Sequence, residues 1–289
     1  MTIQELLTEL RVDFLESGHH HSRFGWIQLR RCPFCSGDNY QLGFQLALKY
    51  FSCWRCGGLW APKVLEALGC SPSQARAFLA GYVEPFPESK RGSIKGQLKL
   101  PRGIGPLQGV HRRYLRARGF DPDELERVWG IKGIGLERRL GWRIYIPIID
   151  HGQQVSWTTR AIGNRISQRY ISAAASDESV PHKRVIYGAD FCAHSVVVVE
   201  GPLDAWAVGP GAGATFGTAF TSAQVKRLVE FPRRVVCFDS SPEAQGKARE
   251  LAAQLACFPG VTDNVVLDAK DPAEATPAEL KRLRRIAKL

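Results

Sequence analysis

The chain has 289 residues, enough for two or three domains, and its 39 Lys and Arg against 28 Asp and Glu give a net charge of +11. No apolar stretch is long enough to span a bilayer, and the N-terminus lacks the basic start and apolar core of a signal peptide. The cysteine pattern is not a disulfide framework of a secreted protein, so we expect a cytoplasmic protein without a membrane partner.

The first chemical signal is a pair of CxxC motifs, Cys32 with Cys35 and Cys53 with Cys56, separated by 17 residues. Four thiolates at this spacing suit a tetrahedral Zn²⁺ ion, which can hold together a small unit with a weak core. Because four protein ligands leave no open coordination position, we predict a structural zinc in a zinc-ribbon domain over residues 1–83. The His19-His20-His21 run is interpreted as a solvated or nucleic-acid-facing loop, with a ligand role as the alternative.

Residues 84–95 are rich in proline and charge and are interpreted as a linker. The segment 96–192 that follows is predicted to be a mixed α+β subdomain, with strands at 143–147 and 154–160 joined by a hairpin-type turn. Residues 90–190 hold 19 basic and 9 acidic side chains, a net charge of +10. A solvated surface would spread the charge more evenly, so this clustering of mostly arginine favours binding of nucleic acid or nucleotides.

Three apolar segments within residues 193–275 each run into an acidic residue. The segments span residues 195–199, 234–238 and 264–267, and the acids that follow are Glu200, Asp239, and Asp268 with Asp271. Continuous β-branched runs between helical segments predict a parallel α/β sheet, whose strands end at a common edge. Carboxylates gathered there would repel one another unless Mg²⁺ or Mn²⁺ neutralised them, which indicates phosphoryl or nucleotidyl transfer. Helix N-capping is the alternative reading for any single carboxylate.

The last segment, residues 276–289, is predicted to be a basic helix. Its apolar positions recur at helical spacing, so we interpret it as a packed helix. Docking of a partner protein is the alternative.

These motifs resemble those of DnaG-type primases. Glu200-Gly-Pro-Leu-Asp204, Phe238-Asp239 and Asp268-Ala-Lys-Asp271-Pro272 are similar to the three motifs of a Toprim domain. The cysteine motifs resemble the family's zinc-binding domain, and their all-cysteine ligand set is closer to phage-type primases than to bacterial ones. The basic segment resembles the N-terminal subdomain of the family's RNA polymerase domain, through Tyr114-Leu-x-x-Arg118-Gly-Phe, Arg143-x-x-x-Pro147-Ile, Trp157-x-x-Arg160, Arg169-Tyr170 and His182-Lys183…Tyr187-Gly188.

The resemblance implies a DNA primase, a DNA-directed RNA polymerase that makes short RNA primers on a single-stranded DNA template from NTPs. It also implies a replicative helicase on a separate chain as a partner. Glu200, Asp239 and Asp271 would be catalytic and hold the divalent ions, with Asp268 as a further candidate ligand. The residues that match nucleotide- or template-binding positions are Arg118, Arg143, Arg160, Arg169 and Lys183. In the zinc-binding domain, the side chains suited to stacking on or clamping bases are Trp26, Tyr40, Trp54 and Arg55.

The chain departs from the family pattern after the second acidic strand, where Asp-x-Asp is replaced by Asp239-Ser240-Ser241. A serine hydroxyl ligates Mg²⁺ weakly and brings no charge. Three readings stay open: one ion held through waters with Ser241 nearby, compensation by Glu243, or a weakened enzyme. Ala273 also stands where many relatives carry another acid.

Two alternatives to an active primase remain. A recombination mediator of the RecR type also joins a four-cysteine knuckle to a Toprim domain, but with the knuckle directly before it. Here 143 residues separate Cys56 from Glu200. The other alternative is a primase-derived protein that binds DNA and has lost activity with the missing carboxylate.

Overall fold

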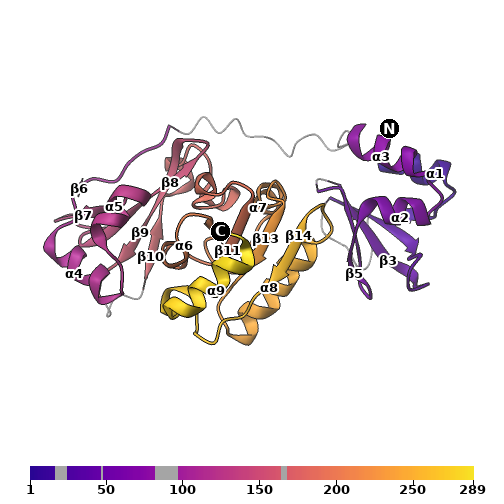
Figure 1. Ribbon diagram of the computed structural model, residues 1–289. Helices are drawn as coiled ribbons and strands as arrows, with labels where there is room; N and C mark the ends of the chain where they lie inside the picture. Colours follow the sequence, from indigo (N-terminus) through magenta and orange to yellow (C-terminus); the bar gives the residue numbers. More distant parts are fainter. Residues whose placement is uncertain (17–24, 47, 82–96, 164–167) are drawn as a thin grey trace. The chain divides into compact units, whose positions relative to one another are not determined.

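The computed structural model describes residues 1–16, 25–46, 48–81, 97–163 and 168–289, and the chain divides into two units (Figure 1). The first comprises Met1–Ser93 with Glu250–Thr262, and the second comprises Ile94–Arg249 with Asp263–Leu289. The histidine run at 19–21 and the expected linker at 84–95 lie outside the described residues. Among the described helices, none is long and apolar enough to cross a membrane.

The first unit is built on an antiparallel sheet whose strands follow one another in chain order. Its strands are β1 (Phe14–Leu15), β2 (Trp26–Arg31), β3 (Asp38–Gln45), β4 (Tyr50–Cys53) and β5 (Gly57–Leu59). Its helices are α1 (Ile3–Glu9), α2 (Ala61–Ala67) and α3 (Pro72–Gly81). Leu29, Leu42 and Phe44 of the sheet are fully buried and share one core with Leu7 of α1 and Leu65 of α2. The sheet therefore holds the loops that carry the cysteines on a hydrophobic base.

The second unit begins with another antiparallel sheet, of order β10-β9-β8-β7-β6. Its strands are β6 (Ile104–Gly105), β7 (Lys132–Ile134), β8 (Arg143–Asp150), β9 (Gln153–Ala161) and β10 (Tyr170–Ser172), with helices α4 (Gly109–Ala117) and α5 (Pro122–Trp129) beside them. Strands β8 and β9 run longer than the predicted 143–147 and 154–160. His151 and Gly152 join them with φ angles of 52° and 74°, the positive values that a tight hairpin turn needs.

A four-stranded sheet of order β12-β11-β13-β14 follows, most of it in the second unit, since residues 250–262 of α8 and β14 are counted with the first. Its strands are β11 (Ser195–Val199), β12 (Ala212–Ala214), β13 (Arg233–Val236) and β14 (Val261–Asn264). Its helices are α6 (Pro202–Val208), α7 (Ser222–Leu228), α8 (Pro242–Leu255) and α9 (Pro277–Ala287). Strand β11 pairs in parallel with both β12 and β13, and all five of its residues are buried, as its continuous apolar sequence predicts. The predicted mixed α/β fold with a parallel sheet is confirmed.

The third strand of this sheet was placed wrongly from the sequence. The apolar run 264–267 was expected to form it, but β14 spans Val261–Asn264. β14 lies at the edge of the sheet and is partly exposed, so it does not need a continuous apolar sequence. The apolar run follows it, with Leu267 buried and Val266 exposed.

The two sheets of the second unit share one hydrophobic core. It joins Trp129 of α5 and Ile146 of β8 to Val197 of β11 and Trp206 of α6. Tyr187 lies between the two sets, stacked on the Trp129 ring and accepting a hydrogen bond from Trp206 Nε1 at 2.8 Å. This continuous core fixes the ends of the parallel strands relative to β9 and β10.

Candidate active site

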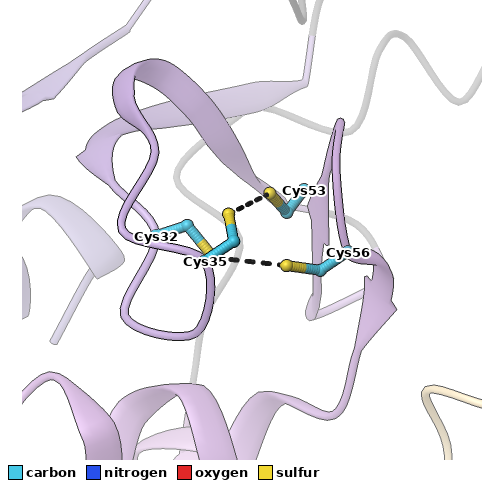
Figure 2. Close-up of side chains that lie close together, drawn as sticks. All are labelled: Cys32, Cys35, Cys53 and Cys56. Atoms are coloured by element: carbon cyan, nitrogen blue, oxygen red, sulfur yellow. Dashed lines mark hydrogen bonds between the residues drawn. The ribbon is translucent and has the colours of Figure 1, made fainter.

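The four cysteines of the CxxC motifs come together in the first unit (Figure 2). The Sγ atoms of Cys32 and Cys56 are 3.9 Å apart, those of Cys35 and Cys53 are 3.7 Å apart, and all four lie within 4.8 Å of one another. Cys32 and Cys35 occupy a tight knuckle after β2, in which the Ser36 N–H donates to Cys32 O and Cys32 N–H donates to Gly37 O.

The chemistry of this cluster fits zinc. A hydrogen bond from the Gly37 backbone N–H lowers the pKa of the Cys35 thiol to about 7, which favours the thiolate that a metal requires, whereas burial raises the pKa of Cys32. Among the described residues, the four cysteines are the one group of three or more Cys, His, Asp or Glu side chains whose ligand atoms all lie within 4.8 Å of one another. Four thiolates leave no coordination position open, so the predicted set would bind a structural Zn²⁺.

The side chains expected to contact bases in this unit differ in accessibility. Trp54 is 63% exposed, and Arg55 next to it is exposed as well. Tyr40 is half-buried, and Trp26 packs edge-on against Tyr50 with ring centroids 5.5 Å apart. Trp54 and Arg55 therefore offer the more accessible surface for a nucleic acid.

A cavity of about 330 Å³ opens in the second unit, where β9 and β10 approach the ends of the parallel strands. Its walls combine both signs of charge. The acidic lining residues are Glu200, Asp204, Asp239, Asp271 and Glu274. The basic lining residues are Arg118, Arg160, Arg169, His182 and Lys270. Further lining residues include Thr158, Tyr170, Ser172 and Phe216.

The three carboxylates predicted to be catalytic all line this cavity. Glu200 directly follows β11, Asp239 follows β13, and Asp271 is the N-cap of the 3₁₀ helix η4 (Pro272–Glu274). Glu200 Oε1 accepts the backbone N–H of Asp239 at 3.0 Å, and Asp271 Oδ1 accepts that of Glu274 at 2.9 Å. The strand ends thus bring together acids that are 32 or more residues apart in sequence.

Each ionised carboxylate in the cavity makes ionisation of its neighbours less favourable. Burial, with added repulsion from Asp239 and Asp271, raises the pKa of Glu200 to about 7. Burial and the repulsion from Asp271 also raise the pKa of Asp239, although the Lys270 ammonium opposes this. A divalent cation among these oxygens would relieve both effects, and carboxylate oxygens are the ligand type that hard cations such as Mg²⁺ and Mn²⁺ prefer.

Asp204 is a site residue to which sequence reasoning assigned no role. It is 8% exposed, and burial followed by the charges of Asp271 and Asp239 raises its pKa to about 7. Its Oδ2 accepts the Gly201 N–H at 3.1 Å and its Oδ1 accepts the Ala273 N–H at 3.3 Å. Asp204 therefore joins the start of α6 to η4. Its place in the Glu200–Asp204 motif, one helical turn after the first acid, was the available signal.

The additional ligands considered for the missing second acid lie elsewhere. Ser241 and Glu243 are exposed and are not among the cavity-lining residues, and the Ser241 hydroxyl accepts the Ala244 N–H at 3.3 Å, capping α8. The acid that does line the cavity is Glu274, which lies close enough to raise the pKa of Asp239 through its charge.

The loop that carries the third acid is held by the last helix. The Asp268 side chain is exposed and is not among the lining residues. Its backbone N–H and that of Ala269 both donate to Glu279 Oε1 of α9 at 3.0 Å. Hydrogen bonds from the Thr276 and Ala269 N–H groups lower the pKa of Glu279 to about 2, so this anchor stays ionised.

Three of the five predicted phosphate-binding cations line the cavity: Arg118, Arg160 and Arg169. Arg160 Nε donates to the Tyr114 hydroxyl at 3.1 Å, and its guanidinium lies 4.9 Å from the centroid of the Tyr170 ring. These contacts orient the arginine from β9 toward the cavity without neutralising its charge.

The other two predicted cations are engaged by backbone carbonyls and are not among the lining residues. Arg143 is 4% exposed and donates to Gln168 O at 2.7 Å and Arg169 O at 3.3 Å. Lys183 Nζ donates to Phe216 O at 2.6 Å, Ala219 O at 3.1 Å and Thr215 O at 3.4 Å. Burial lowers the pKa of both groups. They hold the backbone on either side of the cavity.

Neither a protein-family model nor a curated protein sequence matches the chain. Solved primase structures match its fold. The DnaG catalytic core is 21% identical, over 62% of this chain and 76% of that chain, with a TM-score of 0.50. The Aquifex aeolicus primase, with its zinc-binding and RNA polymerase domains, is 18% identical over 100% and 83% of the chains, with a TM-score of 0.53. The primase fragment of the bacteriophage T7 primase-helicase is 16% identical over 94% and 98%, with a TM-score of 0.44. The resemblance to DnaG-type primases is thus confirmed at the level of the fold by the first two.

Proposed function

We propose that the protein is a primase, which synthesises short RNA primers on single-stranded DNA by metal-assisted nucleotidyl transfer. One observation carries this proposal: the acids Glu200, Asp239 and Asp271 line the same cavity as Arg118, Arg160 and Arg169. That combination suits a nucleoside triphosphate, because arginines bind phosphate oxygens and clustered carboxylates bind the accompanying divalent cation. The fold shared with primases supports the same assignment, with residues 193–275 as a Toprim-type subdomain.

In this proposal Glu200, Asp239 and Asp271 hold Mg²⁺ or Mn²⁺, and Glu274 supplies the carboxylate that is missing at Ser241. When bound, the cation lowers the pKa of the primer 3′-hydroxyl and offsets the charge of the reacting phosphates. Asp204 keeps α6 and η4 together, so that the first and third acids stay at the same end of the cavity. Arg160 and Arg169 bind the phosphates of the nucleotide or the template.

The zinc-binding unit contacts the template in this proposal. Trp54 and Arg55 are accessible for stacking on bases and for phosphate contact, which are the interactions that single-stranded nucleic acid offers. A replicative helicase on a separate chain is the proposed protein partner.

A second candidate is a primase-derived DNA-binding protein without polymerase activity. The observation that favours it is Ser241, whose hydroxyl caps α8 and brings no charge to the cavity. The recombination-mediator alternative is less well supported, because β8, β9 and β10 place Arg160 and Tyr170 on the wall of the same cavity as the acids.

Primer synthesis by the purified full chain tests the proposal. The reaction contains single-stranded DNA templates of mixed sequence, four NTPs, and Mg²⁺ or Mn²⁺, and short RNA products are expected. Template binding without any oligoribonucleotide, on every template and with either metal, would favour the inactive candidate instead.

A further inference from the structure

A second polar cluster adjoins the cavity, centred on Glu178, which is 2% exposed. Its Oε1 accepts the hydroxyl of Ser156 at 2.6 Å, the backbone N–H of His182 at 3.0 Å and the ring Nδ1 of His182 at 2.5 Å. Ser156 belongs to β9 and is fully buried, so the carboxylate is fixed from two sides. His182 begins the 3₁₀ helix η2 (His182–Arg184).

The geometry determines which atom of the His182 ring is available. A carboxylate accepts but does not donate, so Nδ1 carries the proton in the bond to Glu178. The ring also packs edge-on against Phe216, with centroids 5.4 Å apart and an interplanar angle of 85°. Nε2 is then the polar atom left over, and within the described residues it has no recorded partner. His182 lines the cavity and its side chain is 22% exposed, so a ligand can reach it.

The neighbouring lysine turns away from the same cavity. Lys183 was expected to contact phosphates, but its ammonium is held by the carbonyls of Thr215, Phe216 and Ala219. The two consecutive residues therefore have different roles: Lys183 holds the 215–219 loop by hydrogen bonds, and His182 faces the cavity. Phe216 belongs to that loop, so the lysine also supports the surface against which the histidine ring packs.

We infer that His182 contacts the phosphate chain of the bound nucleotide through Nε2, with Glu178 as the residue that positions the ring. This inference rests on the proposed function and adds a residue to its substrate site. Nε2 is the ring atom that remains available on the cavity side, and its N–H form donates a hydrogen bond to an anionic phosphate oxygen that enters the cavity. Arg118, Arg160 and Arg169 supply positive charge to the same cavity, and His182 adds a ring N–H donor on the side of the 215–219 loop.

Equilibrium binding of ATP with Mg²⁺ to the full chain is the first test. His182→Gln is expected to weaken ATP binding about tenfold and to leave adenosine binding unchanged, because the lost contact is to phosphate. His151→Gln is the matched control, because the Nδ1 atom of His151 also lies against a carboxylate, Asp150 Oδ2, at 3.1 Å. The His151 side chain is 72% exposed on the β8–β9 turn and does not line the cavity. Equal ATP affinity of wild type and His182→Gln would overturn the inference.

Nitrogen NMR of histidine-labelled protein gives a readout that does not depend on affinity. The His182 signals are identified by their absence from the His182→Gln spectrum. Addition of ATP and Mg²⁺ is expected to shift the Nε2 signal, and Glu178→Gln is expected to redistribute the proton between Nδ1 and Nε2 in the ATP-free protein. An Nε2 signal that stays the same on ATP addition would exclude the phosphate contact, and an unaltered tautomer in Glu178→Gln would exclude the positioning role.

The outcomes separate this inference from the primase assignment. If the wild type makes primers, but ATP does not change the His182 Nε2 signal and His182→Gln binds ATP as tightly as the wild type, the His182 inference is wrong and the primase assignment stands. A responding His182 in a protein that makes no primers on any template retains the phosphate contact and removes the polymerase activity. If ATP does not bind, the His182 contact is wrong whatever the primer assay shows.

Discussion

Glu200 and Asp239 are joined directly: Oε1 of the first acid accepts the backbone N–H of the second at 3.0 Å. The bond spans the ends of the parallel neighbours β11 and β13, so the side chain proposed to hold the cation also fixes the backbone that presents its partner. A glutamine at position 200 keeps an acceptor oxygen for this bond and removes the negative charge. The substitution therefore separates the two roles.

Glu200→Gln is expected to lower primer synthesis by about 100-fold or more, because the site loses a charged ligand, while template binding and the folded state persist. The measurement is RNA product formed per enzyme with Mg²⁺, alongside a DNA-binding isotherm and a thermal melt. Glu124→Gln, an exposed acid on α5, is the control and should leave all three at wild-type values. Near-normal product from Glu200→Gln would contradict the proposed metal site.

Glu274 and Glu243 are the two candidates for the cation-binding carboxylate that the chain lacks at position 241. Since Glu274 lines the cavity and Glu243 is exposed outside it, Glu274→Gln should require about tenfold more Mg²⁺ for half-maximal activity, whereas Glu243→Gln should not change this value. Ser241→Asp should leave the Mg²⁺ requirement unchanged, because position 241 is not among the lining residues and its side chain caps α8. A higher Mg²⁺ requirement in Glu243→Gln, with a wild-type requirement in Glu274→Gln, would show that Glu243 supplies the missing carboxylate.

Stability should depend on pH through Glu200. Its folded pKa of about 7 is raised from the ordinary value of 4.5, so between these values the folded state binds more protons than the unfolded state. The free energy of unfolding therefore falls as pH rises through this window. Glu200→Gln removes this contribution, so its Tm should rise relative to wild type from pH 5 to pH 8.

The melts are run without Mg²⁺ and without a chelator, which would strip zinc. Mg²⁺ should stabilise the wild type more at pH 8 than at pH 5, because the carboxylates are then ionised. A difference in Tm between the two proteins that is constant across this range would contradict the burial and repulsion described for Glu200.

Removing Lys183 should mainly lower stability, whereas removing Arg169 should mainly weaken the binding of template or nucleotide. Lys183→Met removes the ammonium that binds the carbonyls of Thr215, Phe216 and Ala219, and it should lower the free energy of unfolding by about 1–3 kcal/mol in a urea titration. Arg169→Ala should leave unfolding nearly unchanged but weaken template or nucleotide binding and reduce its dependence on salt. Equal loss of stability in the two variants would contradict this division.

The first unit should contain one zinc ion per chain, measurable by elemental analysis of purified protein. Cys53→Ser should lose the metal and destabilise the unit, because its sulfur faces that of Cys35 at 3.7 Å. Cys192→Ser lies outside the cluster and should retain a full complement of zinc. Wild-type protein free of zinc, or full zinc in Cys53→Ser, would contradict the assignment.

The features that could be predicted from sequence are those whose causes are local. The cysteine cluster needs four ligands that two short motifs contain, and the knuckle geometry depends on a few neighbouring residues. The parallel sheet was predictable because a strand buried on both faces must be apolar throughout, as β11 is. The convergence of Glu200 and Asp239 then follows from the common edge at which parallel strands end.

The features that sequence reasoning missed depend on distant partners. Nothing in the residues around Arg143 or Lys183 shows that their donors would be taken by carbonyls 25 to 36 positions away. The edge strand β14 lacked an apolar signal because it is partly exposed. Asp204 stood in a recognised motif, but its burial became visible only with α6 and η4 in place.

The hold of Glu279 on the Asp268–Ala269 backbone has a consequence for how the protein matures during translation. The ribosome delivers all the proposed cation-binding acids before it delivers residue 279, because the chain is made from the N-terminus. Until α9 has emerged and docked, the segment leading to Asp271 lacks two of its backbone anchors. A nascent chain that already contains every acid of the site would thus be catalytically immature until α9 has been synthesised and has docked.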